Sequence, residues 1–479
     1  MTLFKAMDNP HIPLKARPQR NYFFLGLLVA LFLIFISVQI IDDNFSDLRG
    51  EDNSSYVLLA KSIATGQGYS DINLPGAPPH THYPPVFSLI LSPVVHYFGY
   101  NFMWMRIIVI FCGLLSFYFV ARFFYGLAPP GLPWLGILIA LLVGTNYAIL
   151  FFMGEILTEL PYLLFSLIAL LAFERYIYQD SFKGALYLIP FLSPLLYLTK
   201  SIGIALSVAV FLMLLLRVKN ESGDRRTYIK RLGYFLIAGI APFFIWTVRN
   251  SFYSTGISNY QSIFFQSDYY NLEAGAAGAG GFLARALTNL SYYKRAIPES
   301  LSGNLGFIPP TVFKAVMLAV LIVVAVGFLY ELFRKRELKD FYVLICLLVF
   351  TFWPTYGLGA ARRYALPLIP FFYYYFFMGL GVIVSTKEYL QNDWQLRYSW
   401  VALAALFVLL CCNLFQIRSS FMPASAASRV ERSVEVFNEN RDKRIDSVKL
   451  EKMTNATFKK VVPCYDSYLT AAMLIKTAS

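Results

Sequence analysis

The residues best suited to chemistry lie in an acidic stretch between two apolar regions. From Asp42 to Phe87 the chain carries six carboxylates against two basic side chains, Arg49 and Lys61. Apolar residues at positions 56, 59, 60 and 63 predict a short amphipathic helix, with N-cap candidates at Asp52 to Ser55 and two glycines that end it. An acidic, capped helix beside a membrane surface is a suitable place for chemistry.

Other ionisable residues stand near the ends of apolar segments that are expected to span a membrane. Ionisable groups at membrane depth are costly, and they usually line a cavity or pair with one another. On the topology given below, the following residues converge on the outer face: Asp52, His80, His82, Glu155, Glu159, Lys200, Arg249, Arg362 and Arg363. Together they indicate a pocket for an anionic headgroup at the membrane surface.

The carboxylates of this set also have structural interpretations. Glu155 and Glu159 are four residues apart, so they share one helix face and could be partners of a buried arginine. Asp52 could serve only as a helix N-cap.

The same holds for the basic residues and the histidines. Arg249 and Arg363 could be interfacial anchors, and Lys200 could extend its ammonium group to the membrane surface. His80 and His82 could be ordinary loop residues or, alternatively, metal ligands.

The composition is that of a membrane protein. The chain of 479 residues is 57% hydrophobic, 17% aromatic and 14% charged, whereas about a quarter of the residues of a soluble domain are charged. Several windows without charge reach the roughly 20 residues that a helix needs to cross a bilayer. The net charge of +13 lies mainly in short loops and in the C-terminal region, which fits membrane topology better than a nucleic-acid partner. Five cysteines show no disulfide or metal spacing.

We expect an all-α polytopic protein with eleven transmembrane helices and a cytoplasmic N-terminus. Basic residues precede the first span, Tyr22–Ile41, which is long enough to remain as an anchor, so the first loop (42–84) should lie outside. Residues Pro85 to Phe98 are too few to span and predict an interfacial helix. A second long outer loop is expected at 251–310, and structureless loops of that length are usually functional.

The other spans follow from the apolar runs and the basic loops between them. We expect them at 102–124, 132–151, 156–178, a broken pair within 185–217, 232–248, three more that end near 334, 361 and 387, and a last one at 400–414. The membrane domain would thus cover residues 1–415. Residues 416–479 would form a small extramembrane region on the outer side.

The ordered set of motifs resembles the C-type (GT-C) integral-membrane glycosyltransferases, the superfamily of the protein O-mannosyltransferases and the lipid A aminoarabinose transferase. The similar stretches are D-N-S-S-Y-V-L-L-A-K-S-I-A-T-G-Q-G-Y (52–69), H-Y-P-P-V-F (82–87), E-I-L-T-E-L-P-Y-L-L-F (155–165), L-T-K-S-I-G (198–203), P-F-F-I-W-T-V-R-N (242–250) and R-Y-A-L-P-L-I-P (363–370). None is specific alone, and the resemblance rests on their order and their placement relative to the spans.

The resemblance implies an inverting glycosyltransferase. Such enzymes take a sugar from a polyprenyl-phosphate carrier and pass it to an acceptor on the outer or lumenal side. The base of the family, four residues before a tyrosine, would be Asp52, with Tyr56. By the same resemblance, Lys200, Arg249 and Arg363 would hold the carrier phosphate. The further substrate-binding residues would be Tyr83, Glu155, Glu159 and Tyr364.

Two departures from the family pattern concern a metal ion. Asn53 stands where many relatives have a second acid, and His82 stands where relatives often carry a metal-binding carboxylate before the Pro-Pro pair. The resemblance therefore leaves room for a divalent metal ion at His80 and His82 and implies no organic cofactor.

Two other functions compete with this interpretation. A transporter or flippase of lipid-linked sugars would also place charges near the membrane, but paired halves with interrupted spans are not visible. A polysaccharide ligase would have a long outer loop, but the early acidic loop argues against it. We therefore expect a glycosyltransferase of the bacterial inner membrane, with membrane lipids around it and a lipid, glycan or protein as acceptor.

Overall fold

The computed structural model describes residues 51–129, 132, 134–178, 184–220, 225–253, 260–266, 275–303, 308–355, 357–385 and 394–421. The predicted first span, Tyr22–Ile41, and the extramembrane region beyond Phe421 lie outside these residues. The described elements are α3 (Glu51–Ala64), α4 (Val86–Phe98), α5 (Phe102–Gly126), α6 (Leu135–Gly144), α7 (Tyr147–Met153), α8 (Glu159–Tyr178), η1 (Gly184–Phe191), α9 (Leu192–Thr199), η2 (Ser201–Gly203), α10 (Ile204–Asn220), α11 (Arg225–Phe235), η3 (Leu236–Ile240), α12 (Ala241–Tyr253), α13 (Tyr260–Phe265), α14 (Ala279–Ser302), α15 (Pro310–Arg334), α16 (Leu338–Phe352), α17 (Gly357–Ala365), η5 (Leu366–Leu368), α18 (Ile369–Ser385) and α19 (Trp394–Phe421).

The regular elements of this described part are all helices, as the sequence predicts, and the protein is an integral membrane protein. Seven of the helices are long and apolar enough to cross a bilayer, and an eighth span is formed if the bent pair α6 and α7 is counted as one. The seven are 102–126, 159–178, 201–219, 225–253, 310–334, 357–384 and 398–417. The expected number of eleven is not confirmed by the described residues.

Two predicted spans are broken in the structure. The pair α6 and α7 bends by 59°, where the side chain of Asn146 accepts hydrogen bonds from Ala148 N and Ile149 N and so begins a new helix. The expected break near residue 200 is present, because Lys200 adopts an extended backbone between α9 and η2. Such helix ends leave polar backbone groups that need partners, and they commonly line binding sites in membrane proteins.

The helix predicted in the first loop is α3, followed by the second short helix α4. Positive φ angles of 75° and 76° at Gly66 and Gly68 end α3 as expected. The N-cap assignment is wrong, however, because Asp52 to Ser55 lie within the helix itself. An aspartate there interacts favourably with the helix dipole.

The region 251–310 is not the structureless loop that its composition suggests, since it contains the 24-residue helix α14. Glycines are concentrated around the start of this helix, between residues 275 and 281. Two of its polar side chains fix it to neighbouring segments. Arg285 donates to the carbonyl oxygens of Phe264, Gln266 and Phe352, and Asn289 donates to three carbonyl oxygens at the end of α16.

The helices α15 and α18 are packed with their backbones in contact. A Cβ atom on Gly327 would lie 1.9 Å from Tyr375 O, and one on Gly379 would lie 2.0 Å from Val323 O. Small residues allow this close approach between membrane helices, for which packing rather than hydrophobicity is the driving force.

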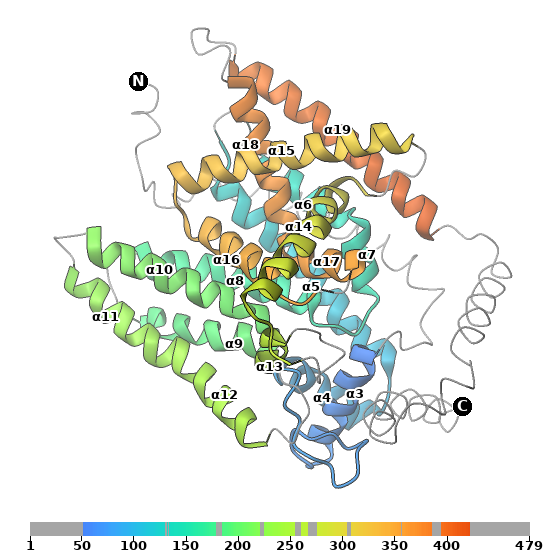
Figure 1. Cartoon of the computed structure of the whole chain (residues 1–479), viewed down its shortest axis with the longest axis vertical. Coiled ribbons are helices and arrows are strands. Elements are labelled where there is room, and N and C mark those ends of the chain that lie inside the picture. The colour runs from blue at the N-terminus through green and yellow to red at the C-terminus, as the bar shows by residue number, and fades with distance from the viewer. Residues whose placement is uncertain are drawn as a thin grey trace, which may run out of the picture.

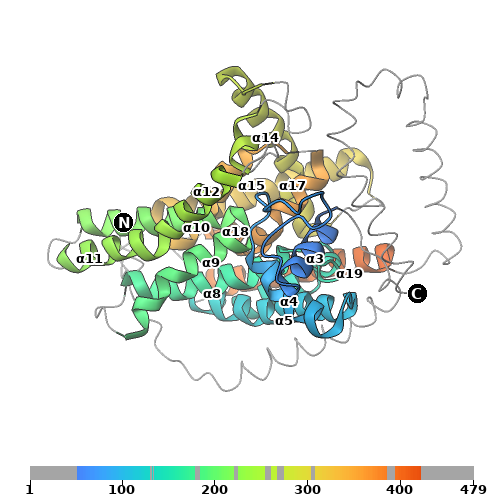
Figure 2. The ribbon, with the colours of Figure 1, turned by 90° about the horizontal axis from the view of Figure 1, so that it is seen from below.

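The two ends of the helical bundle are distinct. The α10–α11 and α15–α16 turns lie towards the left in Figure 1, whereas α3 and α4 lie at the lower right. Figure 2 shows α11 and α3 at the same opposite ends. We call the second of these the α3 end.

Candidate active site

The carboxylate of Asp52 is held by two side chains from distant parts of the chain. Tyr83 donates its hydroxyl to Asp52 Oδ1 at 2.5 Å, and Arg363 Nη1 lies 2.5 Å from Asp52 Oδ2. The side chain of Asp52 remains 30% exposed. It is therefore fixed in position but accessible.

Arg363 also binds a second acid. Its Nε lies 2.5 Å from Glu159 Oε1, and Lys200 Nζ donates to the same oxygen at 2.8 Å. Glu159 is fully buried, so its negative charge requires these two cations. We call Asp52, Arg363, Glu159 and Lys200 the Asp52 cluster. In this order, negatively and positively charged side chains alternate.

Helix ends bring these four residues together. Asp52 lies in the first turn of α3, and Glu159 is the first residue of α8. Lys200 occupies the break before α10, and Arg363 lies two residues before the end of α17, where η5 begins. The predicted convergence of these residues is thus observed in the structure.

Glu155 approaches the Asp52 cluster through Asn53. The amide Nδ2 of Asn53 donates to Glu155 Oε2 at 2.6 Å, and both side chains are buried. Both residues belong to the sequence motifs, but the sequence does not predict that they pair across 102 positions. Asn53 replaces the second acid of the family pattern, and its amide satisfies a carboxylate that a second acid would repel.

Tyr56 lies behind the cluster as a buried ring. Its centroid is 5.0 Å from that of Tyr83 and 5.1 Å from that of Phe87. Burial raises the pKa of the Tyr56 phenol, and the nearby charge of Asp52 raises it further. Tyr56 therefore remains neutral and supports Tyr83 by packing.

The predicted metal ligand His80 has both ring nitrogens engaged. Nδ1 lies 2.7 Å from Asp71 Oδ1, and Nε2 accepts the backbone N–H of Tyr83 at 2.7 Å. This pattern requires a neutral ring with its proton on Nδ1. It leaves no nitrogen for a metal, so His80 acts in this structure as a support of the loop that carries Tyr83. The ring of the other predicted ligand, His82, lies edge-on to that of Tyr83 with centroids 4.6 Å apart.

Arg249 and Tyr364 are close to this region but have no hydrogen bond to the Asp52 cluster among the contacts described. Arg249 Nη1 donates to His80 O at 2.5 Å, and its guanidinium group lies over the rings of Trp246 and Tyr253. The ring of Tyr364 stacks on Phe350, with centroids 6.2 Å apart.

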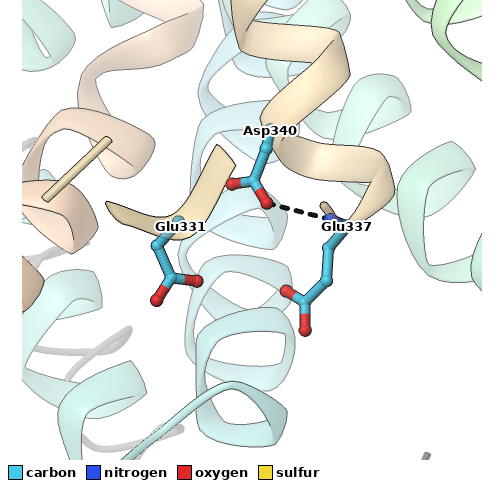
Figure 3. A group of neighbouring side chains, drawn as sticks. All are labelled: Glu331, Glu337 and Asp340. Atoms are coloured by element: carbon cyan, nitrogen blue, oxygen red, sulfur yellow. Dashed lines mark hydrogen bonds between the residues drawn. The ribbon is translucent and has the colours of Figure 1, made fainter. Parts of the chain in front are cut away.

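One group of three carboxylates within the described residues has the spacing of a metal site. Glu331, Glu337 and Asp340 gather at the α15–α16 turn (Figure 3). Lys339 Nζ, however, lies 3.1 Å from Glu331, 2.5 Å from Glu337 and 3.1 Å from Asp340, and this lysine is fully buried. The ammonium group occupies the position of a cation, so the group does not fit a metal ion as it stands.

The residues around this turn complete a second ionic group, which we call the Lys339 cluster: Glu331, Glu337, Lys339 and Asp340. Tyr374 donates to Glu331 at 2.9 Å and Tyr375 donates to Asp340 at 2.9 Å. The sequence alone does not reveal this cluster. A run of charges next to a basic loop is typical of any cytoplasmic turn, and nothing in it indicates that Lys339 is buried.

No family model and no curated protein matches this chain. Solved structures with a similar course of the chain include ArnT from Cupriavidus metallidurans bound to undecaprenyl phosphate, with 14% identity and a TM-score of 0.47 over 84% of this chain and 73% of that one. Another is the archaeal oligosaccharyltransferase AglB from Archaeoglobus fulgidus in complex with an inhibitory peptide and a dolichol-phosphate, with 14% identity and a TM-score of 0.46 over 84% of this chain and 56% of that one. At TM-scores below 0.5, these similarities assign no role to any residue of this chain.

Proposed function

We propose that the protein is an inverting glycosyltransferase that takes a sugar from a polyprenyl-phosphate carrier and passes it to an acceptor hydroxyl on the outer face of the membrane. The observation that carries this proposal is the bridge made by Arg363. One guanidinium group joins the accessible carboxylate of Asp52 to the buried carboxylate of Glu159. A base and a cation for a leaving phosphate thereby stand side by side.

Asp52 would be the general base. The acceptor hydroxyl is a poor nucleophile, and a carboxylate within hydrogen-bond reach takes its proton as the new bond to the sugar forms. The hydroxyl of Tyr83 fixes one oxygen of Asp52. The other oxygen would receive the proton once Arg363 turns towards the donor.

Arg363 and Lys200 would stabilise the leaving phosphate. The bond from the anomeric carbon to the phosphate oxygen breaks as the acceptor attacks from the opposite face, so negative charge grows on the phosphate. Once donor binding has brought Arg363 to the phosphate, the two cations stabilise this charge without further reorganisation. Competition between the phosphate and Asp52 for Arg363 would couple donor binding to release of the base.

Arg249 would bind the carrier phosphate from the other side. Its guanidinium group is held between the carbonyl oxygen of His80 and two aromatic rings. A guanidinium group suits the bidentate recognition of a phosphate.

The test is Asp52→Asn, compared with wild type in cells and as purified protein. Asn has nearly the same shape, so the variant should be produced normally and should still bind a polyprenyl phosphate. Transfer should fall by about 10²- to 10⁴-fold, the usual cost of a lost general base. The measurement is mass analysis of lipid-linked sugars and surface glycans.

The matched control is Asp71→Asn in the same loop. An amide oxygen can still accept the proton of His80 Nδ1, so this variant should transfer at nearly the wild-type rate. Wild-type transfer by Asp52→Asn would overturn the proposed role, and the base would then be sought at Glu155 or Glu159.

A further inference from the structure

A second pair of guanidinium groups lies beside the Asp52 cluster. Arg362 on α17 binds Glu299 on α14 through Nε at 3.0 Å and also through Nη2. Arg295, one turn earlier on α14, donates Nε to the other oxygen of Glu299 at 2.5 Å. The side chain of Glu299 is 2% exposed, whereas those of Arg295 and Arg362 are 55% and 41% exposed.

The helix that presents Arg295 is held in place at both ends of this segment. Asn289 donates to Phe350 O, Thr351 O and Trp353 O, at 3.1, 2.9 and 2.5 Å. At the other end, Asn146 Nδ2 donates to Ser300 O at 2.6 Å. Arg295 therefore extends from a rigid support, which lowers the entropy lost when a ligand binds.

Within the described residues, the charges around this pair are not balanced. One carboxylate serves two arginines, and the neighbouring Lys294 is exposed. Among the described residues, Arg295 donates only through Nε, to Glu299, and its two terminal nitrogens have no acceptor. Surface ion pairs by themselves contribute little to stability. An almost fully buried acid that orders two exposed cations is better explained by a ligand that those cations bind.

The pair adjoins the proposed catalytic site. Arg362 and Arg363 are neighbours on α17, and adjacent residues of a helix point about 100° apart. Arg363 faces Asp52 and Glu159, while Arg362 faces Glu299. Two groups of basic side chains therefore stand next to each other at one turn of α17.

We propose that Arg295 and Arg362 form an anion-binding subsite for a phosphate or carboxylate group carried by the acceptor. This inference rests on the proposed function, in which the carrier's phosphate already occupies Arg363, Lys200 and Arg249. The second basic group then serves the other substrate. Glu299 is a positioning residue that fixes the two forks, and the acceptor's attacking hydroxyl lies near Asp52 while its anionic group binds at Arg295 and Arg362.

The test uses purified full-length protein saturated with a short-chain polyprenyl phosphate, so that the carrier site is filled. Inorganic phosphate is then titrated, and binding is followed by the rise in thermal stability. Arg295→Gln and Arg362→Gln should each weaken phosphate binding about tenfold, because each removes a charge-assisted contact. Lys314→Gln, which removes an exposed cation near the start of α15, should leave it unchanged.

Because Arg295→Gln keeps the Arg362–Glu299 pair, this variant should remain folded. A loss of phosphate binding by it is then not caused by unfolding. The inference is overturned if wild type gains no stability from phosphate, or if both arginine variants bind phosphate as wild type does. It is also overturned if these variants weaken the polyprenyl phosphate instead, because the pair would then belong to the carrier site. Phosphate binding needs no turnover, so failure of the Asp52→Asn test would refute the proposed function separately.

Discussion

At the α3 end of the bundle, Arg363 joins Asp52 to Glu159, while at the α15–α16 turn Lys339 joins three carboxylates. In the Lys339 cluster the ammonium group, Glu331 and Asp340 are fully buried, and two tyrosines donate to these two acids, while Glu337 at the edge is 32% exposed. In the Asp52 cluster, by contrast, the bridging cation is itself accessible: Arg363 is 29% exposed, whereas Lys339 is 0% exposed. The same residue types thus form an enclosed structural clamp in one place and an open site in the other.

This difference in exposure predicts different roles: the buried ion pairs should matter for stability, and the accessible ones for ligand binding. A buried ion pair is seldom a net gain over an apolar pair, but the loss of one partner leaves an uncompensated charge. An exposed pair costs little to break, so its groups can be exchanged for those of a substrate. The accessible cluster is therefore the one expected to bind ligands.

The largest effect is expected for Lys339→Met. Three acids would lose their common cation in a buried site, which should lower the free energy of unfolding by about 3–5 kcal/mol. The measurement is unfolding of the purified protein in mild detergent by added denaturing detergent. Lys335→Met is the control, since Lys335 binds the same Glu331 at 3.0 Å but is 33% exposed, and its loss should cost at most about 1 kcal/mol. If the two variants lower the free energy of unfolding equally, the buried Lys339 contributes no more to stability than the exposed Lys335.

The sequence predicted the helices and the break at Lys200 because hydropathy and short motifs are local signals. It also predicted that Asp52, Glu159, Lys200 and Arg363 lie on one side, because membrane topology constrains helix ends. It could not predict that Asp52 and Arg363, 311 positions apart, are direct partners. Pairing of this kind depends on helix packing, which a single sequence does not reveal.

Two further features depend on contacts between distant segments. The Gly- and Ala-rich start of 251–310 suggested a loop, whereas the helix α14 that follows is stabilised by Arg285 and Asn289 through carbonyl groups of distant segments. The sequence leaves His80 open between an ordinary loop residue and, with the resemblance, a metal ligand. Its two nitrogens are instead taken by Asp71 and the backbone of Tyr83.

The next effect in size is expected for Arg363→Lys. A single ammonium group cannot reach Asp52 and Glu159 as the guanidinium fork does, so the bridge is lost while the charge remains. Donor use should fall about tenfold to a hundredfold, with the fold stable, as measured by transfer at increasing donor concentration. Arg249→Lys should show a smaller loss, since Arg249 lies outside the Asp52 cluster. Unchanged transfer in both variants would remove the two arginines from the site.

A smaller effect is expected for Tyr83→Phe. The variant removes the hydroxyl that fixes Asp52 Oδ1 but keeps the ring that packs on Tyr56. One hydrogen bond to a charged group contributes about 1.5–3 kcal/mol where it is buried, and less at a carboxylate that is partly exposed. We expect a several-fold loss of the maximal rate with little change in stability. A loss as large as that of Asp52→Asn would instead place Tyr83 among the groups that handle the proton.

The smallest effect should come from a chelator added to the wild-type protein and to Lys339→Met. Because Lys339 provides the cation for Glu331, Glu337 and Asp340, removing divalent metals should leave the unfolding midpoint of the wild type unchanged. The variant offers three carboxylates without that ammonium group, and such a set prefers hard divalent cations. Added Ca²⁺ or Mg²⁺ should therefore raise the midpoint of the variant and not that of the wild type. A chelator-sensitive wild type would show that a metal competes successfully with Lys339, and the distinction between a closed clamp and an open site would then fail at this cluster.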